Sequence, residues 1–440
     1  MTSNASWRYV IIGGGLAGLT VAYFLGPSES LVLEREPEVG GVCRSIRVGD
    51  FVFDYTGHLL HFKHPENREW VVSLLGSDAL VEYHRRAFIY VYDRYVPYPF
   101  QVNLYGLPPE VIFECLHGFI EMLLENPERK QTDSFKEWIE TTFGRGIARH
   151  FMIPYNRKFW CRDLDTITTD WVSWAIPRPG LEDVLRGALG IVDREYGYNP
   201  VFWYPRTGGI QILPESIARH LPHVKTRTAV QRIRWKERRV VTSAGVVAYD
   251  TLIATQPLPD IVRQLDPPVP ELSEMARRLR ALTVVNYNLG IRGSAPVDAH
   301  WIYYPESRFV FYRVGFASNF APTMAPAGTY SLYVEVSLDE TQGGVDLEIL
   351  RERVINDLQA AGLLASVSDV IVEHPLIIRP AYVIFDRDRR EIVPHIRAYL
   401  ESHGIFTVGR YAEWAYYSMD DTIHSARSHA EKIREREHVR

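Results

Sequence analysis

The chain has 440 residues, of which 46% are hydrophobic and 23% are charged, and it contains 30 Gly and 27 Pro. This composition is typical of a folded chain with two or three packed units, and it excludes disorder, collagen and coiled coil. Lys and Arg number 49 against 54 Asp and Glu, so the formal charge of −5 offers no basic field for nucleic acid or an anionic membrane. An anionic ligand must therefore be bound by a local cluster of basic residues.

The apolar runs, such as 9–12 and 21–25, are far shorter than the ~20 residues that a membrane-spanning helix needs. Residues 1–7 lack the charged and then apolar pattern of a secretory signal. Cys43, Cys115 and Cys161 cannot all pair with one another and show no metal-ligand spacing, so we interpret each as a small buried residue. We expect a cytoplasmic protein without a metal site, and the oligomeric state is not readable from the sequence.

The first motif is a short apolar run, 8–12, followed by a glycine-rich turn and then by apolar residues at helical spacing in 19–25. The spacing Gly13-x-Gly15-x-x-Gly18 brings backbone N–H groups and a helix N-terminus close to a pyrophosphate. A second apolar run, 31–33, ends at Glu34, about twenty residues on, where an acid would bind a ribose hydroxyl. These features predict a strand, turn and helix that bind a dinucleotide.

The segment after Glu34 favours FAD over NAD. Gly40 and Gly41 permit close backbone approach, and Arg44 offers a fork for phosphate oxygens. The segment is similar to the extension that follows the ribose acid in FAD-dependent enzymes of the glutathione-reductase-like class. No second glycine motif of this kind occurs downstream, so no separate domain for NAD(P)H is predicted.

The remaining pattern predicts an α/β fold with three domains. Helical stretches at 109–124 and 134–151 indicate a mainly helical domain inserted at 65–199. Four β-rich runs, 283–291, 300–304, 308–316 and 329–336, indicate an antiparallel sheet that roofs a pocket, in a substrate domain of 276–399. The discontinuous Rossmann-like FAD domain would comprise 1–64, 200–275 and 400–440, with a late strand ending at 408–410. Asp421 and Thr422 are expected to cap a final helix that runs through Ile433.

With these elements placed, the chain resembles the UDP-galactopyranose mutase family, and its eukaryotic-type branch more than the short bacterial one. The resemblance extends over almost the whole chain. It rests on six short motifs in the right order: Asp54-Tyr55-Thr56-Gly57-His58, Tyr98-Pro99-Phe100-Gln101, Pro154-Tyr155-Asn156-Arg157-Lys158-Phe159-Trp160, Trp301-Ile302-Tyr303-Tyr304-Pro305-Glu306, Phe311-Tyr312-Arg313 and Gly409-Arg410-Tyr411-Ala412-Glu413-Trp414-Ala415-Tyr416.

The resemblance implies an isomerase that interconverts pyranose and furanose forms of a nucleoside-diphosphate sugar, most often a UDP-sugar, without net redox change. In that family FAD is active when reduced, and its N5 is the nucleophile on the anomeric carbon. NAD(P)H is a candidate reductant because eukaryotic-type relatives use it.

The resemblance also assigns roles to individual residues. Gly57 and His58 would lie against the flavin ring, with Arg313 and Arg410 as further catalytic residues. An Arg in a strand as apolar as that around Arg313 needs an anionic partner, which in the family is the substrate diphosphate. The nucleotide pocket would comprise Tyr98, Phe100, Gln101, Asn156 and Trp160. The tyrosines around the substrate phosphates would be Tyr303, Tyr382 and Tyr416. Further contacts to FAD would come from Val230, Gly409, Met419 and Asp420. Trp414 would lie beside Arg410.

Three positions depart from the family pattern. A second Arg near the sugar falls at Ala175, with Arg178 the nearest replacement; a phosphate-contacting Tyr is Phe320; and an aromatic position of the nucleotide pocket is His61. Each lost hydrogen bond is worth about 0.5–3 kcal/mol, so we expect a sugar other than galactose.

Two alternatives stay open. An oxidase or dehydrogenase of the amine-oxidase or protoporphyrinogen-oxidase type shares the N-terminal FAD motifs, but it has no evident use for the 98–101 and 156–160 motifs or for Arg313. In that interpretation Tyr98-Pro99-Phe100 and Trp160 simply belong to the core. The second alternative is a flavin-retaining protein that binds a nucleotide sugar without converting it.

Overall fold

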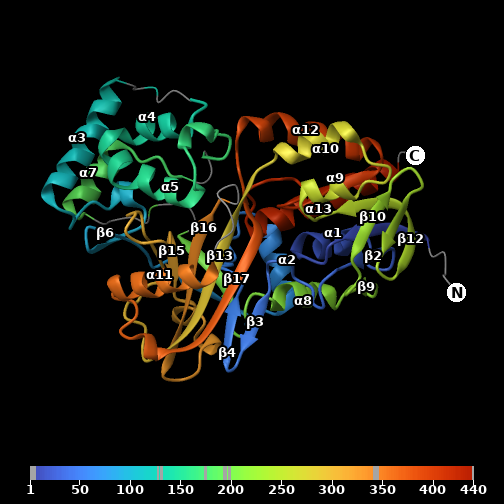
Figure 1. Ribbon diagram of the computed structural model, residues 1–440, viewed down its shortest axis with the longest axis horizontal. Coiled ribbons are helices and arrows are strands. Elements are labelled where there is room, and N and C mark those ends of the chain that lie inside the picture. Colours follow the sequence, from blue (N-terminus) through green and yellow to red (C-terminus); the bar gives the residue numbers. More distant parts are fainter. Residues whose placement is uncertain are drawn as a thin grey trace.

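The computed structural model describes residues 6–125, 128, 132–172, 176–191, 196, 200–339 and 346–438. Figure 1 shows a helical lobe at one end of the molecule, a layer of sheet and helices at the other, and a second sheet between them. No helix in these ranges is both long enough and apolar enough to cross a membrane.

The first sheet carries the glycine motif. Its parallel part has the order β18–β12–β1–β2–β9, and β10 and β11 extend it as an antiparallel ribbon beyond β12. The strands are β1 (Ser6–Ile12), β2 (Ser30–Leu33), β9 (Val224–Lys225), β10 (Val230–Arg234), β11 (Arg239–Thr242), β12 (Gly245–Ala254) and β18 (Ile405–Thr407). Because β1 and β2 are apolar where they pair, except at Ser30, they can be buried on both faces. The strand, turn and helix predicted at the N-terminus are confirmed, with α1 at Leu16–Leu25.

Helices cover this sheet and join it to the rest of the chain. They are α2 (Pro65–Leu75), α8 (Ile212–Ala218), α9 (Leu258–Gln264), α10 (Pro270–Arg278), α12 (Arg387–Ser402) and α13 (Met419–His438). The last helix begins earlier than predicted, because Ser418 and not Asp421 is its N-cap residue. Ser418 Oγ accepts from the Asp421 N–H at 3.1 Å, and Asp421 accepts from the Ser418 N–H at 2.9 Å, which makes a capping box.

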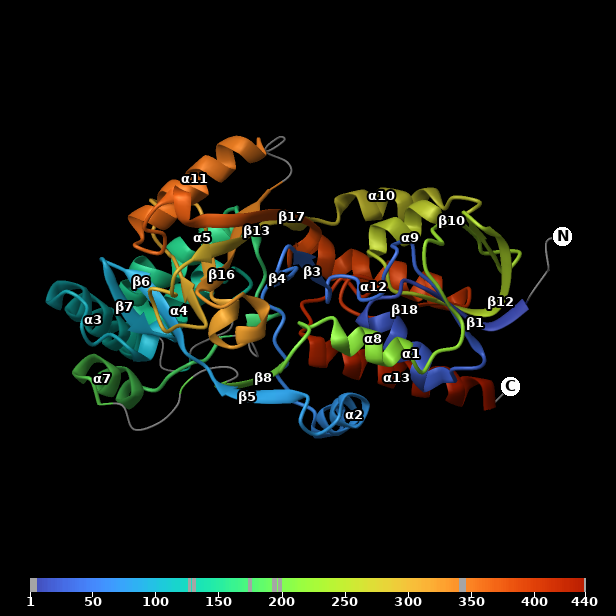
Figure 2. The same cartoon turned by 90° about the horizontal axis from the view of Figure 1, so that it is seen from below.

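The second sheet has the order β17–β13–β16–β15–β14–β6–β7. Its strands are β6 (Ala87–Val91), β7 (Arg94–Pro97), β13 (Ala281–Arg292), β14 (Trp301–Tyr303), β15 (Arg313–Gly315), β16 (Thr329–Leu338) and β17 (Val370–Val383). The predicted antiparallel pairing of the four β-rich runs is confirmed, although β14 also pairs with β6 in parallel. Figure 2 shows α11 (Leu347–Ala360) on one side of this sheet, where its apolar side chains join those of β13 and β16 in one core.

The helical lobe contains α3 (Pro109–Glu125), α4 (Phe135–Ile147), α5 (Ile153–Trp160) and α7 (Leu181–Leu189). The two predicted helices are confirmed, but the segment assigned to the helical domain also contains three strands. Two of them, β6 and β7, belong to the second sheet, and β5 (Leu80–His84) pairs with β8 (Val201–Pro205). The short hairpin β3 (Ser45–Val48) and β4 (Phe51–Asp54) leads into the 54–58 motif.

Candidate functional site

The turn between β1 and α1 requires glycine at two positions. Gly13 has φ +104°, and a Cβ there would lie 2.4 Å from Thr255 Oγ1. A Cβ on Gly18 would lie 2.0 Å from the Gly13 carbonyl oxygen. Gly15, the N-cap of α1, makes no side-chain capping bond, so the first N–H groups of the helix are left for another acceptor. A phosphate group is such an acceptor.

The Gly40–Gly41 segment lies directly against this turn. The Gly40 N–H donates to the Gly14 carbonyl oxygen at 2.8 Å, and Glu34 Oε2 accepts from the Gly14 N–H at 2.6 Å. Arg44 Nε donates to the Gly41 carbonyl oxygen at 2.9 Å. The sequence motifs assigned to the cofactor are therefore adjacent in space, and their small, close-packed backbone fits a dinucleotide.

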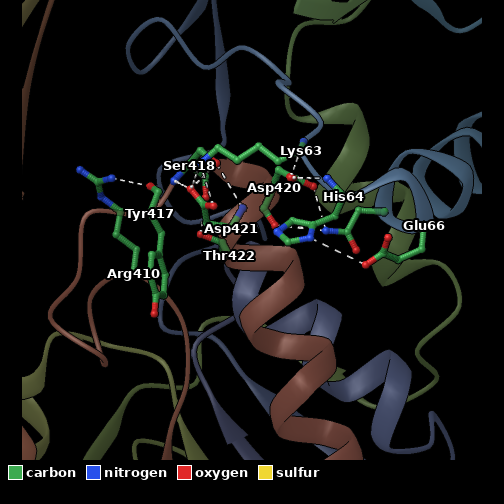
Figure 3. Close-up of polar contacts among 10 residues, drawn as sticks. Lys63, His64, Glu66, Arg410, Tyr417, Ser418, Asp420, Asp421 and Thr422 are labelled. Carbon is green, nitrogen blue, oxygen red and sulfur yellow. Dashed lines mark hydrogen bonds and ion pairs between the residues drawn. The ribbon is translucent and has the colours of Figure 1, made fainter. Parts of the chain in front are cut away.

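Two further predicted cofactor contacts lie near α1. Gly409 has φ +88°, and a Cβ there would lie 2.4 Å from the Cβ of Ala17. Asp420 is buried, and its carboxylate accepts from the backbone N–H of Lys63 at 2.8 Å and of His64 at 3.2 Å (Figure 3). Its side chain thus joins α13 to the chain before α2. Met419 and Val230 are buried, and the Val230 carbonyl oxygen accepts from a Gln264 side chain at 2.9 Å.

The Gly57-His58 loop is anchored through Asp54. This carboxylate accepts from Ser45 Oγ at 2.6 Å and from the Tyr204 hydroxyl at 2.5 Å. Burial raises the pKa of Asp54 to about 6, although these hydrogen bonds oppose the shift. A cavity of about 10 Å³, room for about one water, separates the loop from β16; it is lined by Phe53, Asp54, Thr56, Gly57, Asn288, Ala317, Phe320, Leu332 and Tyr333.

His58 is neutral at ordinary pH. Burial and the charges of Arg410 and Arg313 together lower its pKa to about 4, opposed by a hydrogen bond to the backbone of Thr56. Its Nδ1 lies 3.2 Å from Thr56 Oγ1. The structure therefore brings three predicted catalytic residues close enough for their charges to interact.

Arg313 has an anionic partner within the chain. Its Nε and Nη2 bind the two carboxylate oxygens of Glu335 on β16, the second at 2.8 Å. The Arg313 side chain is 19% exposed and the Glu335 side chain 1%. Glu335 is therefore an anion of the kind that Arg313 was expected to need. The third nitrogen of the guanidinium, Arg313 Nη1, takes part in neither of these two bonds.

The predicted tyrosines belong to one aromatic wall, and two of them flank Arg410. Its guanidinium lies 5.2 Å from the ring centre of Tyr382 and 5.0 Å from that of Tyr416, and these two rings are 5.5 Å apart. Tyr303 packs edge-on against Tyr155 at 5.5 Å. Burial raises the pKa of Tyr155 well above its ordinary value, with Tyr303, Arg313, Tyr382 and Tyr416 as charge neighbours. Burial raises the pKa of Tyr382 as well, so the hydroxyls of Tyr155 and Tyr382 stay protonated and can donate to an anion.

Arg410 is held in place by backbone atoms. Its guanidinium donates to the carbonyl oxygen of Tyr417 at 2.5 Å (Figure 3) and to that of Ala381 at 3.1 Å. Since Glu335 balances Arg313 and His58 is neutral, the charge of Arg410 remains for an anionic ligand.

The predicted nucleotide-pocket residues stay a prediction as a base-binding set, and several of them are buried in this structure. Phe100 and Trp160 are fully buried, and the Phe100 ring stacks on Phe151 at 5.0 Å. Gln101 is also buried and donates to the Pro177 carbonyl oxygen at 3.0 Å, but its own Oε1 has no partner among the described residues. Such an orphaned acceptor suits a ligand N–H or hydroxyl.

The other members of this set have local contacts. Tyr98 packs against Tyr303 at 5.2 Å, next to the aromatic wall. Asn156 donates to the carbonyl oxygen of Met152 at 2.7 Å within its own helical segment.

Arg178 is not placed with these groups. It is exposed, and its guanidinium lies 5.1 Å from the ring centre of Trp138 in the helical lobe. Ala175 lies outside the described residues. Trp414 is buried, and its carbonyl oxygen accepts from Arg389 Nε at 2.8 Å.

The other two departures from the family pattern share one aromatic cluster. Phe202 lies 6.1 Å from the ring of His61 and 5.7 Å from that of Phe320. Burial lowers the pKa of His61 to about 4, so its ring is uncharged and suits this apolar environment.

Sequence reasoning gave no role to Glu335, Tyr155 or Tyr333. A signal for Glu335 was present, because it is the one charged residue in the β-rich run 330–338. Tyr333 carried no signal: its ring occupies the space that Gly57 and Gly315 leave free, where added Cβ atoms would approach within 2.7 and 1.8 Å.

The chain is similar to several solved structures over nearly its whole length. A reduced UDP-galactopyranose mutase has a TM-score of 0.90 at 26% identity, covering 97% of this chain and 95% of that one. A candidate protoporphyrinogen oxidase from Exiguobacterium sp. has a TM-score of 0.74 at 19% identity, covering 98% and 99%. Putrescine oxidase has a TM-score of 0.66 at 16% identity, also covering 98% and 99%. The protoporphyrinogen oxidase and putrescine oxidase structures show that this chain shares their fold.

Residues 16–434 match the sequence family described as flavin-containing amine oxidoreductase, a match that implies FAD as the cofactor. The glycine turn, the buried Glu34 and the close-packed Gly40–Gly41 segment are the features that this cofactor needs. The chain belongs to the flavin-containing amine oxidoreductase family.

Proposed function

We propose that the protein is a mutase that interconverts the pyranose and furanose forms of a nucleoside-diphosphate sugar. The observation that carries the proposal is the cluster of Arg313, Arg410 and buried tyrosines beside the Gly57-His58 loop. A cationic amine would be repelled by two arginines, whereas a diphosphate can bind them together with the surrounding phenol hydroxyls. The similarity to a reduced UDP-galactopyranose mutase supports the same proposal.

Each group in the cluster has a role that follows from its environment. Arg410 is the cation whose charge is available, and Arg313 is oriented by Glu335 so that Nη1 can reach a phosphate oxygen. The tyrosine hydroxyls donate hydrogen bonds without adding charge. His58, being neutral, can donate or accept a hydrogen bond beside the reacting atoms without repelling a cationic sugar carbon. Bound reduced FAD would supply the nucleophile through its N5.

Gln101 is proposed to read the nucleoside, because its buried Oε1 lacks a partner among the described residues. A uracil N–H would satisfy it, and UDP-sugars are therefore the first class to test. The sugar is proposed to differ from galactose, on the basis of His61, Phe320 and Ala175.

The test is an NMR or chromatographic assay of the purified protein, oxidised and dithionite-reduced, against UDP-, CDP-, GDP- and TDP-sugars. We expect a furanose product with the reduced protein alone. Substrate-driven bleaching of the flavin with peroxide release in air, and no isomerisation, would move the protein to the oxidases. Binding of a nucleotide sugar with neither reaction would identify a non-catalytic binding protein.

A further inference from the structure

Three metal-ligating side chains converge where α2 meets α13, outside the proposed active site. His64 is the N-cap residue of α2, Glu66 lies in its first turn, and His424 lies in the second turn of α13. Their donor atoms all lie within 4.8 Å of one another. Sequence spacing could not reveal this group, because His64 and His424 are hundreds of residues apart.

The three donors are close together but are not yet arranged around a common point. The Nδ1 atoms of His64 and His424 lie 3.8 and 3.9 Å from the same Glu66 oxygen, Oε1, too far for hydrogen bonds. The two imidazole rings are stacked, with centres 3.9 Å apart and planes within 5°, so their in-plane lone pairs lie in parallel planes and one ring must turn before both can reach one ion. Around a tetrahedral zinc ion with bonds of about 2.0–2.1 Å, donors lie about 3.3 Å apart, so the two His–Glu pairs must each close by about 0.5 Å.

The side chains can make that movement while their backbones stay fixed. They are 30%, 47% and 47% exposed for His64, Glu66 and His424, so rotation is not blocked by packing. The backbone of His64 is held to α13 by Asp420, as Figure 3 shows. Lys63, the nearest cation in that view, is neutralised by Asp421 at 3.0 Å.

We propose that His64 Nδ1, His424 Nδ1 and Glu66 Oε1 bind one divalent transition-metal ion, with water completing the coordination, and that the ion fastens α2 to α13. Two imidazoles and one carboxylate suit zinc, nickel or copper, whereas magnesium and calcium prefer oxygen ligands alone. This site does not depend on the proposed function, because no substrate or flavin enters the argument.

The test is isothermal titration of the untagged, metal-stripped holoprotein with zinc chloride, with magnesium chloride as the comparison. We expect 1:1 binding of zinc but not magnesium, and a higher midpoint of thermal unfolding with zinc. His424→Ala or Glu66→Gln should each weaken zinc binding at least ~100-fold, since even the loss of an outer partner of a ligand costs 10–100-fold.

His117→Ala is the matched control, because His117 forms an exposed His–Glu pair with Glu121 at 3.4 Å on α3. This variant should bind zinc like the wild type. Unchanged zinc affinity in His424→Ala, or no 1:1 binding by the wild type at millimolar zinc, would overturn the proposal.

Discussion

Replacing Arg313 by Ala separates the catalytic and structural roles of the Arg313–Glu335 pair. The variant leaves the Glu335 carboxylate, 1% exposed, without its partner. Removing one partner of a buried ion pair costs about 3–5 kcal/mol of the free energy of unfolding. With an unfolding entropy of about 2.1 cal/mol/K per residue, cooperative unfolding of 440 residues would lower the midpoint temperature by roughly 3–5 °C. Turnover should be abolished while the yellow flavin remains bound, because the proposed function places Arg313 against the substrate and not against the cofactor.

The double variant Arg313→Ala with Glu335→Gln distinguishes the two effects. Removing the uncompensated charge should recover most of the lost stability, but activity should stay absent because no guanidinium is restored. In the single variant, the unpaired carboxylate takes up a proton as the pH falls, so its loss of stability should be smaller near pH 5 than near pH 8. The measurements are thermal unfolding, flavin absorbance and the isomerisation assay. Full activity in the single variant would remove Arg313 from the site, and no recovery of stability in the double variant would refute the account of the pair.

The other predictions concern a buried histidine and two glycines. Burial lowers the pKa of His300 to about 3, so below about pH 6.5 the unfolded chain takes up a proton at this residue and the folded chain does not. Between pH 6.5 and 5 this difference lowers the free energy of unfolding by roughly 2 kcal/mol. In denaturant titrations, His300→Gln should remove this contribution of His300 to the pH dependence. Gly57→Ala should reduce turnover, since its Cβ would lie 2.7 Å from Tyr333 Oη, and adding Tyr333→Phe should restore part of it in the same assay. Gly409→Ala, with its Cβ 2.4 Å from Ala17, should lower the amount of FAD retained after gel filtration; normal retention would contradict the close packing.

Local sequence signals predicted the elements that depend on near neighbours in the chain. The glycine spacing between β1 and α1, the periodicity of α3 and α4 and the β-rich runs of β13 and β16 are confirmed. Strands β6 and β7 were missed inside the segment assigned to helices, although they pair with each other as a local hairpin; the pairing of β6 with β14, more than two hundred residues later, has no local signal. Residue spacing carries no trace of such pairing.

The sequence by itself determined that the chain binds a dinucleotide and that Arg313 requires an anion. Both follow from local chemistry: glycine permits a tight turn beside a phosphate, and a charge in an apolar strand must be compensated. The tertiary structure alone decided that Glu335 supplies that anion, that Phe100 and Trp160 face the core, and that His64 meets His424. These outcomes depend on which distant strands and helices pack together, and packing is a property of the whole fold.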